Sequence, residues 1–162
     1  MRLLASLGGG ALAVGLIIGG VLWWNRGAHV ELKGGILKVR SQAMEETSTV
    51  VVVDFRFANT SDYPFVVREV EVILEDDQGK EHTGRTVSEV DARRIFKYYP
   101  LLGQKFNDSL VLRDRVPSRA SMDRMIAASF ELPQARVDKR RRLRIRIVEV
   151  DGGVSEMVEG GP

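Results

Sequence analysis

The sequence contains no cysteine and only two histidines, His29 and His82. Without cysteine, neither a disulfide framework nor a thiolate metal site can form, so the fold must be stabilised by packing. A serine-type catalytic site needs a histidine that transfers a proton, and a zinc site needs several nitrogen, sulfur or carboxylate ligands. His29 lies in a linker and His82 in a polar hairpin arm, where we expect solvated side chains. The sequence therefore predicts no enzyme activity, no metal and no cofactor.

The chain also lacks a large excess of charge of either sign, with 24 Lys and Arg against 22 Asp and Glu. Two of the basic residues, Arg2 and Arg26, flank an apolar segment, which leaves the remainder of the chain close to neutral. Binding to nucleic acid usually needs a basic patch that covers one face of a domain. We therefore expect no nucleic-acid partner.

Charged residues are absent from residues 3–24. At about 1.5 Å per residue, a helix of this length crosses a hydrocarbon layer of about 30 Å. Trp23 and Trp24 close the run in the manner of an interfacial aromatic belt. A cleaved signal peptide would have a shorter apolar core, and the only Ala-x-Ala site, Ala11 to Ala13, lies inside the run. Residues 1–26 are therefore predicted to be an uncleaved transmembrane signal-anchor, which makes the chain a single-pass membrane protein.

The orientation of this anchor is open to two readings. The positive-inside rule compares Arg2 and the amino terminus with Arg26, Lys33, Lys38 and Arg40 on the far side, and taken alone it favours a cytoplasmic domain. A signal-anchor before a small β domain is, by analogy, a common arrangement of exported proteins. We expect the exported orientation, with the domain on the periplasmic or extracellular side.

Small residues recur at four-residue intervals within the predicted membrane helix, at Ala11, Gly15 and Gly19. This spacing places them on one helix face and lets two helices approach closely, which predicts a homodimer through the transmembrane helix. The alternative is that glycine is simply frequent in membrane helices.

Beyond a linker at residues 27–33, short runs of β-formers alternate with turn residues over residues 34–151. We expect strands near 36–40, 47–58, 65–75, 80–86, 109–113, 125–132 and 143–150, a hairpin turn at 76–79, and a short helical turn after Ser88. No long amphipathic helix separates these strands. The fold class is therefore predicted to be all-β, an antiparallel immunoglobulin-like or fibronectin-like β-sandwich of about seven strands. Residues 152–162, which are rich in glycine, are expected to form a flexible tail.

The series Val53–Ser61, followed by Tyr63-Pro64-Phe65 and Val70–Leu74, resembles the opening of late-embryogenesis-abundant type-two domains and of related bacterial membrane-anchored immunoglobulin-like modules. The similarity covers about a third of the chain. It implies a non-enzymatic sandwich fold and transfers no functional residue. Downstream, Pro117–Ala120 stands where those domains usually carry a Pro-Gly turn.

A basic cluster near the end of the chain is one candidate binding surface, because arginine and lysine attract the phosphates of lipid headgroups and polyanions. Its members are Lys139, Arg140, Arg141, Arg142, Arg144 and Arg146. The alternative is that the arginines occupy the solvent face of a strand and are balanced by Glu69 and Glu71 on another strand.

An aromatic and apolar segment is the second candidate, because such residues in an irregular loop can anchor a partner protein. It consists of Phe96, Tyr98, Tyr99, Leu101 and Leu102. The alternative is that the segment closes one end of the core, which burial of its side chains would indicate.

These observations together predict a non-enzymatic, membrane-anchored β-sandwich that acts as a protein-interaction or accessory module of the cell envelope. The expected partners are the membrane, through residues 3–24, and a protein whose identity the sequence does not give. Two alternatives stay open. One is a stress-protective protein that binds many clients with low specificity, and the other is an unrecognised hydrolase.

Overall fold

A computed structural model of the chain describes residues 15, 19, 20 and 30–161. In chain order its elements are β1 (Leu32–Glu45), β2 (Ser48–Asn59), β3 (Phe65–Glu75), β4 (Glu81–Thr86), α2 (Glu89–Tyr98), the 3₁₀ helix η1 (Pro100–Leu102), β5 (Arg115–Val116), β6 (Ser121–Phe130), α3 (Gln134–Asp138), β7 (Arg142–Glu149) and β8 (Val154–Val158).

Most of the predicted membrane segment, residues 3–24, lies outside the described residues, and so does Ala11 of the proposed helix–helix face. Within that segment Gly15, Gly19 and Gly20 are described as helical and exposed. Across the part of the chain that the structure describes, no helix has both the length and the apolar character needed to span a membrane.

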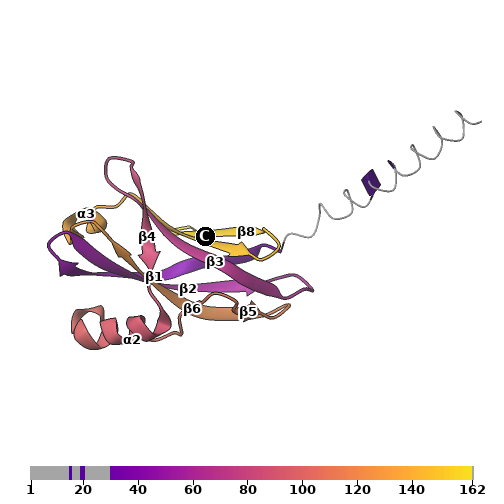
Figure 1. Cartoon of the computed structure of the whole chain (residues 1–162), viewed down its shortest axis with the longest axis horizontal. Helices are drawn as coiled ribbons and strands as arrows, with labels where there is room; N and C mark the ends of the chain where they lie inside the picture. The colour runs from indigo at the N-terminus through magenta and orange to yellow at the C-terminus, as the bar shows by residue number, and fades with distance from the viewer. Residues whose placement is uncertain (1–14, 16–18, 21–29, 162) are drawn as a thin grey trace, which may run out of the picture.

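The strands form one curled antiparallel sheet in the order β1-β2-β6-β4-β3-β7-β8, with β5 paired to β3. The curl gives the sheet the shape of a half-barrel (Figure 1). Its two edges approach each other at the start of β1, where the Leu32 amide donates a hydrogen bond to Ser155 Oγ of β8 at 2.8 Å. The prediction of an antiparallel all-β domain is confirmed, whereas the finer prediction of two sheets packed face to face is not.

The main core fills the concave side of the half-barrel. Side chains alternate along β7: Leu143, Ile145 and Ile147 point into this core and are fully buried, while the arginines between them face outward. Phe55 and Phe57 of β2 add two stacked rings with centroids 5.7 Å apart. Burial of these side chains is the main favourable term in folding.

The strand β2 is buried on both faces, which a continuous valine run is able to support. Val51 and Val53 face the main core, whereas Val50 and Val52 belong to a second, smaller apolar cluster. That second cluster is covered by α2 and η1, which lie against the outer side of the sheet (Figure 1).

The strand β4 crosses the sheet obliquely. Its residues up to Gly84 pair with β3, whereas Arg85 and Thr86 pair with Ser129 and Ala128 of β6. Because β4 leaves one neighbour as it joins the other, the start of β4 and the end of β6 diverge. A cleft of about 660 Å³ opens between them.

Three local predictions need correction. Residues 154–158, inside the segment expected to be a flexible tail, form β8, because Ser155 and Met157 alternate into the core. The domain starts before residue 34, because Val30 and Leu32 are buried. The strand expected at 109–113 is only a bridge from Ser109 to Met125, and a short β5 follows it.

Candidate interaction surface

The helix α2 begins where the sequence provides an N-cap. The Ser88 hydroxyl accepts a hydrogen bond from the Asp91 amide at 3.2 Å, which satisfies one of the free N–H groups of the first turn. Glu89 and Asp91 place negative charge in that turn and Lys97 places positive charge in the last one, as the helix dipole favours.

The inner side of this segment closes the second apolar cluster. Ala92 of α2 and Leu102 of η1 are fully buried against Val50, Val52 and neighbouring β6 side chains. Ile95, Phe96 and Tyr99 pack against the same cluster and are partly buried. This half of the predicted aromatic segment therefore occupies a core position.

A buried arginine fixes the backbone that follows α2. Arg40 of β1 donates from Nη1 to the carbonyl oxygens of Leu102 at 2.6 Å and Gln104 at 2.8 Å. Its Nη2 donates to Asp54 Oδ2 at 2.6 Å, and both side chains of this ion pair are more than 90% buried. The guanidinium lies over the rings of Phe96 and Phe106, at 5.0 and 5.7 Å from their centroids. Arg40 thus fixes the backbone at residues 102–104 by hydrogen bonds, while the ion pair with Asp54 and the contacts with two aromatic rings hold the guanidinium in place.

A second anchor lies at the start of α2. The Glu89 carboxylate accepts hydrogen bonds from the Ser109 amide at 3.0 Å and from Arg93, and it forms an ion pair with Lys105 at 3.0 Å. Burial by itself raises the pKa of Glu89, but the bonds from Ser109, Lys105 and Arg93 outweigh it and lower the pKa to about 2. Glu89 therefore ties the middle and the end of the 99–109 loop to the helix.

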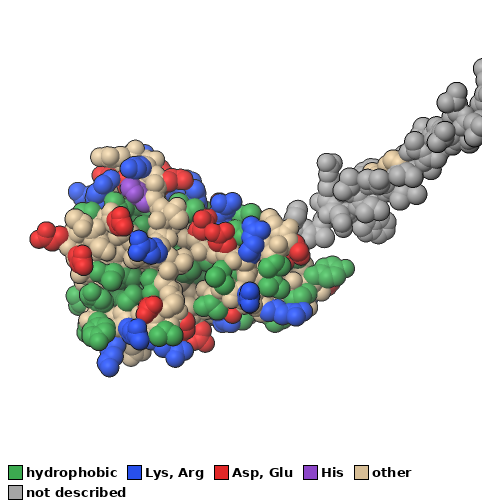
Figure 2. Space-filling view, viewed as in Figure 1, with side chains coloured by type: hydrophobic (Ala, Val, Ile, Leu, Met, Phe, Trp, Pro, Cys, Tyr) green, Lys and Arg blue, Asp and Glu red, His purple; other side chains and the backbone are tan. Residues whose placement is uncertain are grey.

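The outer side of this clamped segment exposes large apolar side chains. Tyr98 is 74% exposed and Leu101 is 88% exposed, and Phe106 and Met44 are also exposed. Beside Tyr98 lies a groove of about 610 Å³, whose apolar lining includes Met44, Ile95 and Tyr99. Figure 2 shows hydrophobic side chains gathered over α2 and the adjoining end of the sheet. We call Met44, Tyr98, Leu101 and Phe106, with this groove, the α2–η1 surface.

Two exposed lysines lie on one side of this surface, whereas Glu45 and Glu46 follow Met44 on another. Lys97 lies in the last turn of α2, and Lys38 Nζ lies 6.0 Å from the centroid of the Phe106 ring. Both lysines are exposed, and neither forms an ion pair with another described residue. Arg94 is also exposed but is paired with Asp91 at 3.1 Å. A partner with carboxylates near its apolar residues would complement the side of this surface on which Lys97 and Lys38 lie.

The predicted aromatic segment is therefore divided by the structure. Phe96, Tyr99 and Leu102 pack inward, whereas Tyr98 and Leu101 point outward. The sequence offered a choice between core closure and partner binding, and the fold assigns inward and outward positions within the same segment.

The predicted basic cluster does not form one free patch. Three of its arginines are paired with carboxylates of other elements, namely Arg140 with Glu159, Arg144 with Glu81, and Arg146 with Glu71. Lys139, Arg141 and Arg142 are exposed. Glu71 lies directly opposite Arg146 in the β3–β7 register, and Glu75 lies opposite Arg142.

The structure also brings together residues that the sequence did not single out. His82, which was expected to be solvated, is largely buried and lies 2.9 Å from the fully buried Asp76, so that expectation was wrong. Arg136 contacts the same carboxylate from α3 at 2.6 Å. The Arg40–Asp54 pair was missed as well, because neither residue belongs to a motif. Strand pairing brings Arg40 to Asp54, and the position of α3 beside the β3–β4 turn brings Arg136 to Asp76.

Comparison of the chain with family models, curated proteins and solved structures finds no match. Within the described residues, no group of three or more His and carboxylate side chains is placed to hold a metal ion.

Proposed function

We propose that this protein is a membrane-tethered interaction module that binds a segment of a partner protein through the α2–η1 surface. The main supporting observation is that Tyr98 and Leu101 are exposed on a backbone that Arg40 and Glu89 hold in place. Exposed aromatic and apolar side chains that are already ordered lose little conformational entropy on binding, which is a property of interface anchors.

The partner segment is one that presents an apolar side chain flanked by carboxylates. The apolar side chain enters the groove beside Tyr98, and the carboxylates face Lys97 and Lys38. Burial of the apolar residues provides affinity, whereas the opposite charges mainly provide orientation and a faster association rate.

Site-specific photo-crosslinking of the full-length chain in membranes of its source organism tests this proposal. A photoreactive residue in place of Leu101 is expected to give one defined adduct, and the crosslinked peptide is expected to contain Asp or Glu. Tyr98→Ala should reduce the adduct by about tenfold or more, the loss typical of an interface anchor.

Tyr63 provides the matched control, because it is an exposed tyrosine in the β2–β3 connection. Tyr63→Ala should leave the adduct unchanged, and a photoreactive residue at position 63 should not give it. Equal adducts from positions 63 and 101, or a ladder of many adducts, would contradict the proposal. The ladder is the result that low-specificity client binding predicts.

The proposal also includes the predictions from sequence about the membrane tether, its orientation and the homodimer. The tether is the uncharged run of residues 3–24, with the domain on the exported side and the two transmembrane helices of a homodimer in contact at Ala11, Gly15 and Gly19. The resemblance of residues 53–74 to immunoglobulin-like modules supports a non-enzymatic role. Each of these statements is a prediction from sequence.

A further inference from the structure

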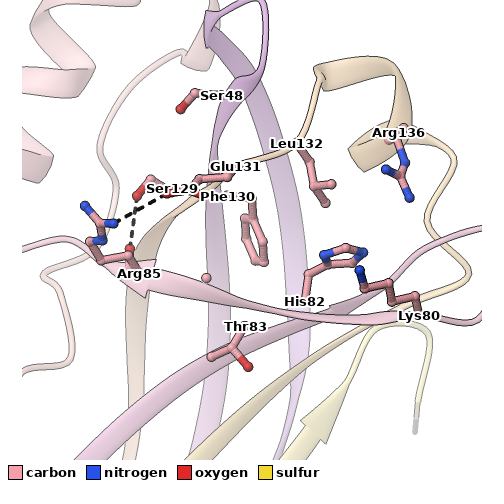
Figure 3. A pocket seen from close by; sticks show the side chains of 11 residues that line it. Ser48, Lys80, His82, Thr83, Arg85, Ser129, Phe130, Glu131, Leu132 and Arg136 are labelled. Atoms are coloured by element: carbon pink, nitrogen blue, oxygen red, sulfur yellow. Dashed lines mark hydrogen bonds and ion pairs between the residues drawn. The ribbon is translucent and has the colours of Figure 1, made fainter.

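The oblique course of β4 leaves a second site, which extends from the β3–β4 turn to Ser129, a residue that also lines the groove beside α2. The cleft between residues 80–85 and residues 129–132 has a floor formed by Phe130, and Ser48 and Arg136 complete its wall. Figure 3 shows the side chains of Lys80, His82 and Arg136 pointing toward one another at one end of this cleft. We call this space the β4 cleft.

A buried carboxylate organises that end of the cleft. Asp76 accepts hydrogen bonds from the amides of Gln78 and Lys80, both at 2.9 Å. Its other oxygen, Oδ2, contacts His82 Nε2 at 2.9 Å and accepts a bond from Arg136 Nη2 at 2.6 Å. These contacts, with His82 first, hold the pKa of Asp76 well below its usual range. An imidazole from β4 and a guanidinium from α3 are thereby fixed beside one another.

Positive charge exceeds negative charge in the β4 cleft. Lys80 and Arg136 converge at one end, and Asp76 balances only one of them. Lys80 contributes its backbone amide to Asp76, and its exposed side chain forms no ion pair with another described residue. At the other end, Arg85 and Glu131 are 3.6 Å apart and are 82% and 92% exposed, a geometry in which an ion pair contributes little.

The cleft does not have the arrangement of a hydrolase. Ser48 lies across the cleft from His82 rather than against its ring (Figure 3), so the Asp76–His82 pair has no serine within reach of the imidazole on the cleft side shown. What the cleft does offer is several N–H donors and an ammonium group around a space larger than a single small ion. Arginine, lysine and hydroxyl donors in this combination match the tetrahedral oxygens of a phosphate group.

We propose that the β4 cleft binds a phosphate group, carried either by a soluble phosphorylated molecule or by a lipid headgroup, with Lys80 and Arg136 as its main contacts. Its main contacts, Lys80 and Arg136, do not belong to the α2–η1 surface, although Ser129 lines both hollows. Lys80 supplies an adaptable point charge, whereas Arg136, oriented by Asp76, supplies a planar donor pair. Arg85 and the Ser48 hydroxyl lie at the opposite wall of the cleft and contact the remainder of the phosphorylated molecule.

Titration of the full-length chain with inorganic phosphate in a maltoside detergent, at constant ionic strength with chloride, tests this proposal. Amide chemical shifts should move at residues 78–85 and 129–136. Lys80→Gln should weaken phosphate binding by about tenfold, because it removes one charged hydrogen bond. It should not change folding, because the bond to Asp76 comes from the Lys80 backbone. Lys33→Gln, at an exposed lysine of β1, is the matched control and should bind as the unchanged chain does.

Two competition arms identify the source of the phosphate. A soluble phosphate monoester and phosphatidic acid in mixed micelles are each added to the phosphate complex, and the stronger competitor shows which of the two the site receives. Shifts spread over the exposed arginines of the whole surface, or equal phosphate affinity in Lys80→Gln and the unchanged chain, would overturn the proposal. A failure of photo-crosslinking at Leu101 would leave this result unaffected, so the two proposals are tested separately.

Discussion

At Gly84 the sheet has no room for a side chain. A Cβ atom there would lie 2.6 Å from Phe130 Cζ and 2.8 Å from Ala128 Cβ. Phe130 is the floor of the β4 cleft, so its ring lies where β4 and β6 separate. The glycine is therefore required by a close approach and not by its backbone angles.

Gly84→Ala is expected to lower the free energy of unfolding by about 1–3 kcal/mol, because the added methyl overpacks this contact. Urea denaturation followed by circular dichroism measures the change. Combining it with Phe130→Leu should cost less than the sum of the two single changes, because the smaller side chain makes space. Strictly additive losses would show that the Phe130 ring is not the obstacle.

Arg40 and Asp54 offer a second test at the residue scale, because the chain contains a matched exposed pair. The Arg40–Asp54 contact is 2.6 Å with side chains 9% and 6% exposed, whereas the Arg56–Asp123 contact is also 2.6 Å but with side chains 61% and 39% exposed. The two ion pairs therefore have the same contact distance but differ in how deeply their side chains are buried.

Asp54→Ala is expected to destabilise the domain by about 3–5 kcal/mol, because it leaves the Arg40 guanidinium buried without its charge partner. Asp123→Ala should have little measurable effect, since water replaces the lost carboxylate. Both are measured as free energies of unfolding in urea. Similar losses for the two variants would mean that the Arg40–Asp54 pair is reached by solvent.

Among the elements, α2 is joined to the loop that follows it by a carboxylate. Glu89 is the first residue of the helix and also bonds the Ser109 amide and Lys105, so it joins the helix to the loop that presents the exposed side chains. Its ordinary pKa of 4.5 is lowered to about 2 in the folded chain. Because the folded state favours the ionised form, Glu89 stabilises the fold fully above about pH 5, and this contribution is lost as the pH falls from 4.5 toward 2.

Glu89→Gln should therefore reduce stability at pH 7 and make the loss of stability between pH 4.5 and pH 2 shallower than in the unchanged chain. Unfolding free energies measured in urea across this pH range give the comparison, and the other carboxylates cancel in the difference. A constant difference between the two proteins at all pH values would contradict the assigned role of the ionised carboxylate.

The strand β8 matters at the scale of the element because it lies where the sequence predicts a tail. Met157 is buried in the main core, while its neighbour Glu156 is exposed on the same strand. Met157→Ala should destabilise the domain by about 2–5 kcal/mol, as expected for a buried large-to-small change, and Glu156→Ala should not. Thermal unfolding of the two variants provides the test. An unchanged thermal unfolding midpoint for Met157→Ala would mean that residues 154–158 do not pack into the core.

For the whole molecule, the proposed tether makes a prediction that does not depend on the partner. The full-length chain should stay with the membrane fraction after alkaline extraction, because residues 3–24 carry no charge. Leu16→Arg combined with Ile17→Arg should move it to the soluble fraction, since each central arginine costs about 2.5–3.5 kcal/mol on insertion. Leu16→Ile is the conservative control. Recovery of the unchanged chain in the soluble fraction would exclude the tether.

Local pattern alone predicted much of the domain. The alternation Leu143, Ile145 and Ile147 predicted β7, and the turn at 76–79 predicted the hairpin between β3 and β4, which Gly79 completes with a φ of +83°. Ser88 predicted a capped helical turn, which in the structure is the first turn of the longer helix α2. These features depend on contacts between residues close in the chain, which is why the sequence was sufficient for them.

The tertiary structure decided everything that depends on which strand lies beside which. The sequence determined that the domain is antiparallel and rich in β-strands, because periodicity fixes which side chains share a face of each strand. It did not determine that β4 crosses from β3 to β6, that β8 closes on β1, or that Asp76 meets Arg136 across 60 residues. Those pairings join distant segments of the chain, and their selection depends on packing the whole core at once.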